Sequence, residues 1–427
     1  MRLLRPRWAI AAGTVVSVLA WSALALAGAV YGWGHRALAP PGDSRAFVAA
    51  AKRLIESRNR GNIGFRLIQG GSPQGEMFMS IGDPVRGDTL FQVASLSKWV
   101  TAWTVMTLVE SGKVQLDAPV SRYLTRWHLP ASDFDNDGVT VRRLLSHTAG
   151  LTDGLGFGAG YAPGEELPSL ESALNHPDAS PGHSGVIRVG AAPGSRWQYS
   201  GGGYLILQLL IEEVAREPFE DYVRRAILDP LGMQRSAFSV DASTPDVAAL
   251  YDVDGKKTIH RRFNAKTAMA LYTSVDDMTR FVQAHLDGPA HEPAGRGVLR
   301  PQTLRLMRRP EGASLGADIW GLGVMLFAPA GTDDFVFGHD GSNDPAINAA
   351  VRLNPLNGDG IVVLETGDHT LASALAGEWV YWQTGTLDFI MLTMAGRSIM
   401  FRIIAGSVVI ILIGLLLGWR AGRASAT

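Results

Sequence analysis

The sequence predicts an α+β protein in which an antiparallel sheet is flanked by helices and interrupted by a large helical insertion, with a transmembrane helix near each terminus. Three observations lead to this class. Both ends of the 427-residue chain carry long apolar stretches without charge. Strand-like runs with short, turn-rich connections occur within residues 63–81 and 335–365, and residues 90–320 between them read mostly as helix and loop. Such short connections suit antiparallel strands, because parallel strands need long crossovers.

The first apolar stretch, residues 8–33, predicts a membrane anchor. Its 26 residues hold no charge, and 20 of them are apolar. As a helix the stretch is about 39 Å long, enough to cross a hydrocarbon core of about 30 Å. Three arginines precede it, which favours a cytoplasmic N-terminus. A cleaved signal peptide is the alternative, because residues 25–29 contain two A-x-A sites. Either interpretation exports the middle of the chain.

A second apolar stretch predicts a transmembrane helix over residues 399–420. Residues 403–419 carry no charge, and Arg402 can extend the span by reaching toward the lipid headgroups. A C-terminal helix folded onto the domain is the alternative. If both stretches span, the termini lie in the cytoplasm. We therefore expect a protein of a bacterial-type inner membrane whose main domain, residues 44–388, lies on the extracytoplasmic side.

The middle of the chain is expected to build its sheet from both of its ends. An amphipathic helix over residues 44–57, with Ser44 as its N-cap, opens the domain, and a helix over residues 371–381 closes it. Apolar runs bounded by Gly, Asn and Pro indicate the strands. These runs are residues 63–69, 76–81, 335–338, 346–353 and 360–365.

One segment of the insertion is rich in residues that break regular structure. Residues 153–196 hold 9 Gly and 5 Pro in 44 positions, which excludes long helices or strands. A disordered linker has this composition too. We favour a loop at the rim of a pocket, because Trp197 and Tyr199 follow directly.

The composition excludes several classes of protein and site. The formal net charge of -1 argues against a nucleic-acid-binding protein, which presents a strongly basic face. The absence of Cys excludes disulfides, thiolate nucleophiles and Cys-ligated zinc. Neither an HExxH motif nor a cluster of His suggests a metal. We therefore expect no metal and no other cofactor.

A serine and a lysine at the start of an apolar helix form the first chemical signal. Ser95 lies at the expected first turn, and Lys98 lies three residues later on the same face. A serine hydroxyl is a weak nucleophile until a nearby base accepts its proton. Burial and the positive end of a helix dipole both lower the pKa of a lysine, which makes it such a base. A helix-capping serine beside a solvated lysine is the alternative for this tetrapeptide taken alone.

Further motifs follow in an order that resembles the serine β-lactamases and penicillin-binding proteins. SLSK at residues 95–98 resembles their first motif, and LLSHTAGL at residues 144–151 resembles a segment of the class C-like branch. PGSRWQYSG at residues 193–201 resembles the stretch with that branch's Tyr-x-Asn motif, and GHDGSN at residues 338–343 resembles the third motif. The matches cover about residues 45–385. The chain is therefore identified as a member of this family, with a β-lactamase/transpeptidase-like fold.

The resemblance implies a role for each matching position. Ser95 is the expected acylated nucleophile, and Lys98 is its proton acceptor or electrostatic partner. Tyr199 is expected to share the general-base work and to pass a proton to the leaving group. A phenol between a lysine ammonium and a serine is also expected to ionise below its usual pKa near 10. The N–H groups of Ser95 and Ser342 form the expected oxyanion hole.

The third motif and the Tyr-x-Asn motif both depart from the family pattern. Gly201 stands where the family has the Asn that holds the lysine and the acyl side chain. His339-Asp340-Gly341 replaces Lys-Thr-Gly, and Gly341 is expected to let the substrate lie against the strand. His339 is neutral or partly charged near pH 7, and Asp340 adds a negative charge. A substrate carboxylate would therefore find less positive charge, which favours a broad ester or amide hydrolase over a dedicated β-lactamase.

Three other patterns are set aside. GASLG at residues 312–316 matches G-x-S-x-G but lacks the buried strand and the helix that a nucleophile elbow needs. Residues 133–138 open like an EF-hand loop, but Leu144 stands where a bidentate Glu is required, so we expect a turn before a helix. His147 is interpreted as a structural histidine.

These observations predict a membrane-anchored serine hydrolase that cleaves an ester or amide through an acyl-enzyme at Ser95. D-Amino peptides, β-lactams and esters all stay open as substrates. The expected partners are a small-molecule or peptide substrate and the lipid bilayer, and no nucleic acid; an oligomeric state is not predicted. The alternative is a catalytically decayed family member that binds cell-wall peptides or a membrane partner.

Overall fold

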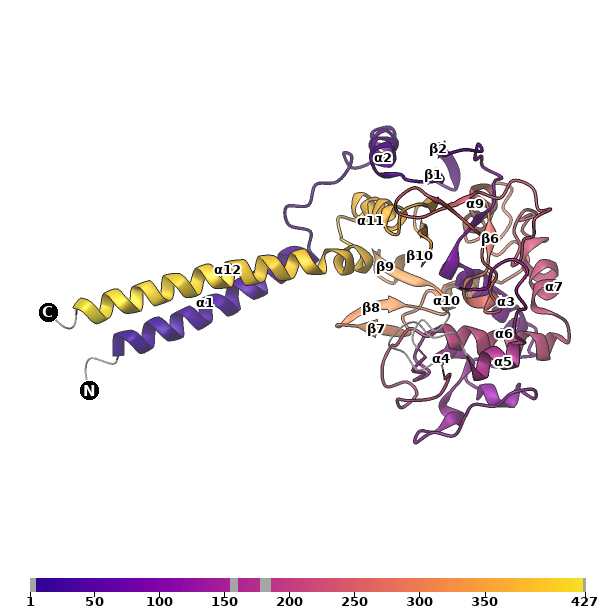
Figure 1. The fold of residues 1–427 in the computed structure, drawn as a ribbon, viewed down its shortest axis with the longest axis horizontal. Helices are drawn as coiled ribbons and strands as arrows, with labels where there is room; N and C mark the ends of the chain where they lie inside the picture. The colour runs from indigo at the N-terminus through magenta and orange to yellow at the C-terminus, as the bar shows by residue number, and fades with distance from the viewer. Residues whose placement is uncertain (1–4, 154–159, 177–185, 425–427) are drawn as a thin grey trace.

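The computed structural model describes residues 5–153, 160–176 and 186–424 and confirms the α+β class (Figure 1). The strands of its main sheet are β1 Ile63–Gln69, β2 Ser72–Met79, β7 Gly312–Ser314, β8 Ala317–Trp320, β9 Met325–Ala330, β10 Asp334–Asn343, β11 Ile347–Asn354 and β12 Asp359–Thr366. They lie in the order β2-β1-β12-β11-β10-β9-β8-β7, and every pairing is antiparallel. Because β1 pairs with β12, the sheet joins the two ends of the domain as expected.

Helices cover both faces of this sheet. They are α2 (Ser44–Arg58) and α11 (Leu371–Thr384) on one face, and α3 (Ser97–Glu110) and α9 (Val275–Gln283) on the other. The central strand β11 is buried along its whole length. Its successive side chains face opposite sides of the sheet, and helices cover both sides. Ala350 packs in the core on the α11 side, and Val351 packs in the core on the α3 side.

The regular elements of the large insertion between β2 and β7 are mostly helices, joined by long irregular segments. Its further helices are α4 Val141–Leu145, α5 Leu170–Asn175, α6 Gly201–Ala215, α7 Phe219–Val223, α8 Lys266–Met269 and α10 Pro301–Met307. Two short ladders also occur, β3 (Phe91–Gln92) with β6 (Tyr272–Thr273) and β4 (Leu250–Tyr251) with β5 (Lys257–Thr258). Short turns of 3-10 helix cover Ala94–Leu96, Val120–Arg122 and Asn136–Gly138, and a π-helical turn covers Arg224–Leu228. The insertion packs on the α3 face of the sheet and carries one side of the site described below.

The two terminal helices, α1 (Arg5–Val30) and α12 (Phe389–Ala424), run side by side away from the domain (Figure 1). Both are long and apolar enough to cross a membrane, by length and composition. Their contact is close, because a Cβ at Gly406 would overlap the indole of Trp21. The Trp21 Nε1–H also donates a hydrogen bond of 3.2 Å to the Ile403 carbonyl. The C-terminal helix therefore leaves the domain instead of folding onto it.

The structure corrects four expected element boundaries. The N-cap of α2 is Asp43, not Ser44, because the Asp43 carboxylate accepts the Ala46 N–H at 2.9 Å. Strand β2 begins at Ser72, since the turn after β1 is tighter than the GGSPQG run suggests. Helix α12 begins ten residues before the expected span, at Phe389. Strands β7 and β8 lie within residues 90–320, which were expected to be mostly helix and loop, and β9 lies just after them, where no strand was expected.

The segments set aside as chemical motifs have ordinary structures. GASLG forms β7 and the turn to β8, where Leu315 and Gly316 take positive φ angles. The acidic run forms a 3-10 turn in which Asp135 accepts the Asp137 N–H, followed by α4, so the expected turn before a helix is confirmed. Within residues 153–196 the described part holds only one short helix, α5. The expected pocket rim falls largely on residues 154–159 and 177–185, which lie outside the described residues.

Candidate active site

Ser95 lies in a tight turn that ends β3 and begins α3. Ala94 takes a positive φ of 44°, which is uncommon for a residue with a side chain and aims the next residue away from the strand. The Ser97 hydroxyl fixes this turn, because it donates to the Ala94 carbonyl at 2.6 Å and accepts the Leu271 N–H at 2.9 Å. Ser95 is partly exposed, whereas its neighbours in the turn are buried. Its hydroxyl is thus presented from a rigid support.

Lys98 is buried and directed at Ser95. Its side chain lies one helical turn after the serine, and its Nζ is 3.1 Å from the Ser95 Oγ. The Nζ also donates to the Ala268 carbonyl at 2.8 Å. Burial lowers the pKa of Lys98 to about 7, and the nearby carboxylate of Asp153 partly opposes this shift. At neutral pH a large fraction of this amine is therefore unprotonated and able to accept a proton.

Tyr199 comes from the segment before α6 and completes this group. Its hydroxyl hydrogen-bonds to the Ser95 side chain. The Lys98 Nζ lies over the face of the Tyr199 ring, 4.8 Å from its centroid. Removal of water from around the phenol raises the pKa of Tyr199 above its usual value. The expectation of a lowered pKa was therefore wrong, because the effect of burial outweighs the interaction with Ser95, which lowers the pKa.

His339 approaches the same group from β10. Its side chain is 1% exposed, and its ring lies 5.4 Å from that of Trp320. The Nδ1 lies 2.6 Å from the Asp340 carbonyl, which only accepts, so Nδ1 carries the proton. The Nε2 is then an acceptor, and it has no hydrogen-bond partner in the part of the chain that the structure describes. Burial lowers the pKa of His339 to about 3, so the ring is neutral near pH 7.

Asp340 points to the opposite face of the sheet from His339. Its carboxylate pairs with the guanidinium of Arg352 on β11, whose side chain is fully buried. The Arg352 guanidinium therefore balances the Asp340 charge on the face of the sheet opposite His339. The expectation that Asp340 adds a negative charge for the substrate was wrong, because successive side chains of a strand face opposite sides.

Gly341 and Ser342 place the edge of β10 against the serine turn. A Cβ at Gly341 would overlap the Val93 carbonyl oxygen, so only glycine permits this approach. The pairing of β9 with β10 ends at Gly338. The Asp340 N–H points toward β9, where it meets the Met325 Sδ at 3.3 Å. Because N–H groups two residues apart on a strand point the same way, the Ser342 N–H points to the same edge; Ser342 is exposed and lies beyond the last described residue that pairs with β9.

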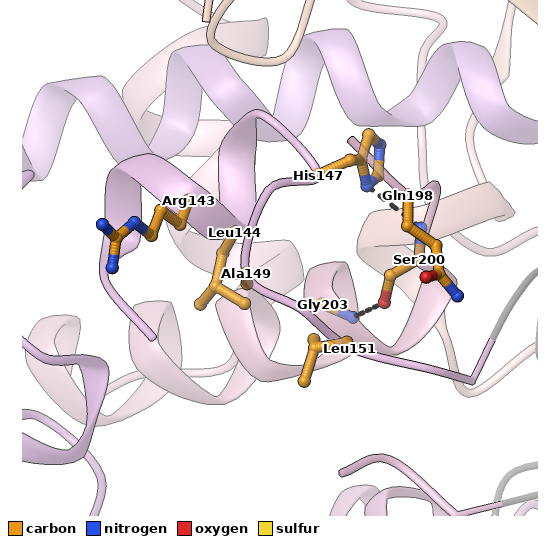
Figure 2. Close-up of a pocket in the computed structure, with 8 residues that line it drawn as sticks. All are labelled: Arg143, Leu144, His147, Ala149, Leu151, Gln198, Ser200 and Gly203. Carbon is orange, nitrogen blue, oxygen red and sulfur yellow. Dashed lines mark hydrogen bonds between the residues drawn. The ribbon is translucent and has the colours of Figure 1, made fainter. Parts of the chain in front are cut away.

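Gly201 is the first residue of α6 and supplies no amide side chain. The residues around it are held by Asp153 instead, which is 1% exposed. The Asp153 carboxylate accepts the Ser200 hydroxyl at 2.5 Å and the Gly202 N–H at 2.7 Å. The Ser200 hydroxyl in turn accepts the Gly203 N–H at 2.9 Å, as an N-cap (Figure 2). A buried carboxylate thus fixes the segment that follows Tyr199.

His147 packs against Tyr199 and hydrogen-bonds to the residue that follows it. Figure 2 shows its ring directed at the backbone nitrogen of Ser200, whose N–H donates to Nδ1 at 3.1 Å. The imidazole packs on the Tyr199 ring, with the centroids 4.3 Å apart, and on Trp320 at 4.7 Å. Burial holds its pKa well below the usual value, so the ring is neutral. These contacts agree with the prediction that His147 is a structural histidine.

The structure thus brings Ser95, Lys98 and Tyr199 into one hydrogen-bonded group, with the β10 residues alongside. Asp153 was not predicted, although only Thr152 separates it from the LLSHTAGL segment. An acidic residue inside a Gly-rich loop carries no signal of burial. Arg352 was missed as well, because a lone Arg in a strand usually faces solvent.

Comparisons with known proteins point in one direction. The family described as Beta-lactamase matches residues 49–386. Esterase EstB of Burkholderia gladioli is 29% identical over 335 residues, covering 66% of this chain and 80% of EstB. The D-alanyl-D-alanine-carboxypeptidase/endopeptidase AmpH of Escherichia coli is 25% identical, covering 57% of this chain and 62% of AmpH. The octameric penicillin-binding protein homologue from Pyrococcus abyssi has a similar fold, with a TM-score of 0.64 at 23% identity over 81% of this chain and 78% of that one.

Proposed function

The chain belongs to the β-lactamase family of serine hydrolases, and we propose that it is a membrane-anchored, extracytoplasmic member that forms an acyl-enzyme at Ser95. The contact that carries this proposal is the Ser95 hydroxyl, 3.1 Å from the amine of Lys98 and hydrogen-bonded to Tyr199. A nucleophile, a base and a proton donor within reach of one another are what acyl transfer needs.

Acylation begins with the unprotonated fraction of Lys98. Its amine accepts the Ser95 proton while the serine oxygen bonds to the substrate carbonyl carbon. The N–H groups of Ser95 and Ser342 are proposed to hold the oxyanion, one from the turn and one from the open edge of β10. Tyr199, kept neutral by its raised pKa, gives its proton to the leaving alcohol or amine and regains one from the Lys98 ammonium. In deacylation, water attacks the acyl carbon and Lys98 accepts its proton; the bond to the Ser95 oxygen then breaks, and Lys98 returns the proton to that oxygen as the acid product leaves.

The substrate is proposed to be an ester, or an amide without a carboxylate beside the scissile bond. His339 is neutral near pH 7, and its free Nε2 is an acceptor. A carboxylate has only acceptors, so it gains neither a charge partner nor a hydrogen bond from this ring. A hydrogen-bond donor on the substrate suits the ring well. Together with the similarity to EstB, this favours esters over β-lactams and D-alanyl peptides with a free carboxylate.

Anchoring is proposed from the two terminal helices. Both meet the length and hydropathy needed to span a bilayer, and they lie side by side. The arginines before α1 favour a cytoplasmic N-terminus. With two spans the domain between them lies on the other side, at the outer surface of a bacterial-type inner membrane.

A non-catalytic binding module is the alternative that the Gly201 and Asp340 departures raised. In the structure, Arg352 pairs with Asp340, and Asp153 holds the segment around Gly201. Both departures are therefore compatible with an assembled site, and neither favours the loss of catalysis.

Covalent labelling tests the proposal. A fluorophosphonate probe should modify Ser95, with the adduct located by mass spectrometry of a digest. A hydrolysis panel of nitrophenyl esters, a cephalosporin and D-alanyl peptides should show ester turnover. Ser95→Ala should lower that turnover by about 1000-fold or more. An adduct on another residue of the folded protein, or equal turnover by the alanine variant, would contradict the proposal, and inactivity on the whole panel would favour a binding module.

A further inference from the structure

The first turn of α12 is embedded in the domain beneath the catalytic strand. Asp388, fully buried, caps the helix, because its carboxylate accepts the Met391 N–H at 2.7 Å. Phe389 stacks on Phe327 of β9, with ring centroids 5.7 Å apart and planes at 8°. Gly377 of α11 leaves the space that Met391 fills. The apolar helix that leaves the domain is thus fixed at its root by close packing.

A buried guanidinium joins this helix root to β10. Arg352 is fully buried, lies 3.4 Å over the face of Phe327, and pairs with both Asp340 and Asp388. Its Nη2 is 3.6 Å from the Asp388 carboxylate. Charges removed from water need such partners, and loss of one partner leaves an uncompensated charge in the core. Elements β10, β11 and α12 are therefore bound electrostatically at one point.

Asp340 connects Arg352 to the residues of the proposed active site. Its carbonyl accepts the His339 Nδ1–H at 2.6 Å and so sets the tautomer of that ring. Its N–H meets Met325 at the place where β10 leaves β9. The Ser342 N–H follows two residues later on the open edge. A shift of Asp340 therefore moves both the acceptor nitrogen and the proposed oxyanion donor.

We infer that Asp388 is a positioning residue for catalysis: through Arg352 and Asp340 it ties the root of the apolar helix α12 to the edge of β10 that carries His339 and the Ser342 N–H. The inference rests on the proposed function, because it assigns those two groups their part in acyl transfer. Neither Asp388 nor Arg352 touches the reacting atoms. Their effect is on the position of β10, so they are expected to change the rate of the chemical step more than substrate binding.

The test is Asp388→Asn in the full chain, reconstituted in lipid nanodiscs and assayed with the best ester of the panel. Asparagine still caps a helix but does not pair with Arg352 as an anion. We expect kcat to fall about tenfold or more with KM within about twofold, because oxyanion donors act mainly in the transition state. The affinity for a boronic acid that mimics the tetrahedral state should fall in parallel. Asp388→Glu, which keeps the charge, should recover most of kcat.

The matched control is Asp368→Asn. Asp368 caps α11 by accepting the Leu371 N–H at 3.0 Å and pairs with Arg58, away from β10. This variant should lower the Tm like Asp388→Asn but leave kcat and boronate affinity unchanged. Equal losses of kcat in both variants, an unaltered kcat in Asp388→Asn, or failure of both Asp388 variants to fold would overturn the positioning role. Absence of turnover by the wild-type chain would instead refute the proposed function.

Discussion

At the scale of single residues, burial decides which groups can exchange protons. Lys98 loses most of its contact with water, which brings its pKa to about 7, while the pKa of His339 falls to about 3. Burial raises the pKa of Tyr199. Between pH 5 and 9 these three groups therefore offer one ionisation, that of Lys98. A base that is half unprotonated near neutral pH is well matched to its task.

The pH dependence of catalysis follows from that single ionisation. Below pH 7 the Lys98 amine is protonated and cannot accept the Ser95 proton, and above pH 7 it is free. We expect kcat/KM for a neutral ester to rise with pH through an inflection near 7, without a fall before pH 9. A pH–rate profile over pH 5 to 9 measures this. A flat profile, or one that falls with rising pH, would exclude Lys98 as the base.

Asp153 provides an internal check on this assignment. Its carboxylate raises the pKa of Lys98, so Asp153→Asn should move the inflection to lower pH. The variant should also lose about 1–3 kcal/mol of stability. The amide nitrogen of asparagine cannot accept a hydrogen bond, so either the Ser200 hydroxyl or the Gly202 N–H loses its buried acceptor. The exposed Asp133→Asn serves as the control and should leave both the profile and the Tm unchanged.

At the scale of elements, the site depends on how closely two backbones approach. The turn that carries Ser95 and the edge of β10 meet at Gly341, where a side chain has no space. Neither element alone contains both proposed oxyanion donors. The packing of α3 on the sheet therefore sets the distance between these donors, and with it the fit to a tetrahedral intermediate.

Gly341→Ala tests this dependence. The added methyl group overlaps the Val93 carbonyl, so β10 must move away from the Ser95 turn. We expect kcat to fall by about 100-fold and stability to fall by about 1–3 kcal/mol. Steady-state kinetics and thermal unfolding measure the two effects. Gly396→Ala, where a Cβ meets nothing within 4 Å, is the control. Near-wild-type kcat in Gly341→Ala would show that the two elements do not need this contact.

The sequence predicts those features that depend on residues close together in the chain, and it does not predict those that depend on contacts between distant elements. Strand β1 and the Ser95–Lys98 pair depend on local periodicity and spacing, and both were predicted. The tyrosine was placed by its motif, but its pKa depends on how completely the fold buries the phenol. Short strands such as β7 hold too few residues for a pattern. The buried Arg352 joins three elements, and no local pattern reports its partners.

At the scale of the whole molecule, the two terminal helices form one antiparallel pair. Close approach at Gly406 and Gly414 brings α1 and α12 together, as small residues do in membrane helix pairs. The start of α1 and the end of α12 therefore lie at the same end of the pair (Figure 1). The domain is held at two points, by the chain that follows α1 and by the root of α12. With the anchoring proposed above, this arrangement would restrict how the site can turn relative to the membrane surface.

The helix pair can be tested directly, because the chain contains no Cys. Ala11 and Leu415 line the same apolar groove between the two helices. With Cys at both positions, a short bismaleimide should join α1 to α12 in membranes, so that the two helices stay together on a gel after proteolysis of the domain. Gly406→Ile, which drives a side chain into Trp21, should reduce this cross-link severalfold. The matched variant Gly13→Ile, at a position where a Cβ meets nothing within 4 Å, should cross-link like the parent. Cross-linking that is unaffected by Gly406→Ile, or absent in the parent, would show that α1 and α12 do not pair in the bilayer.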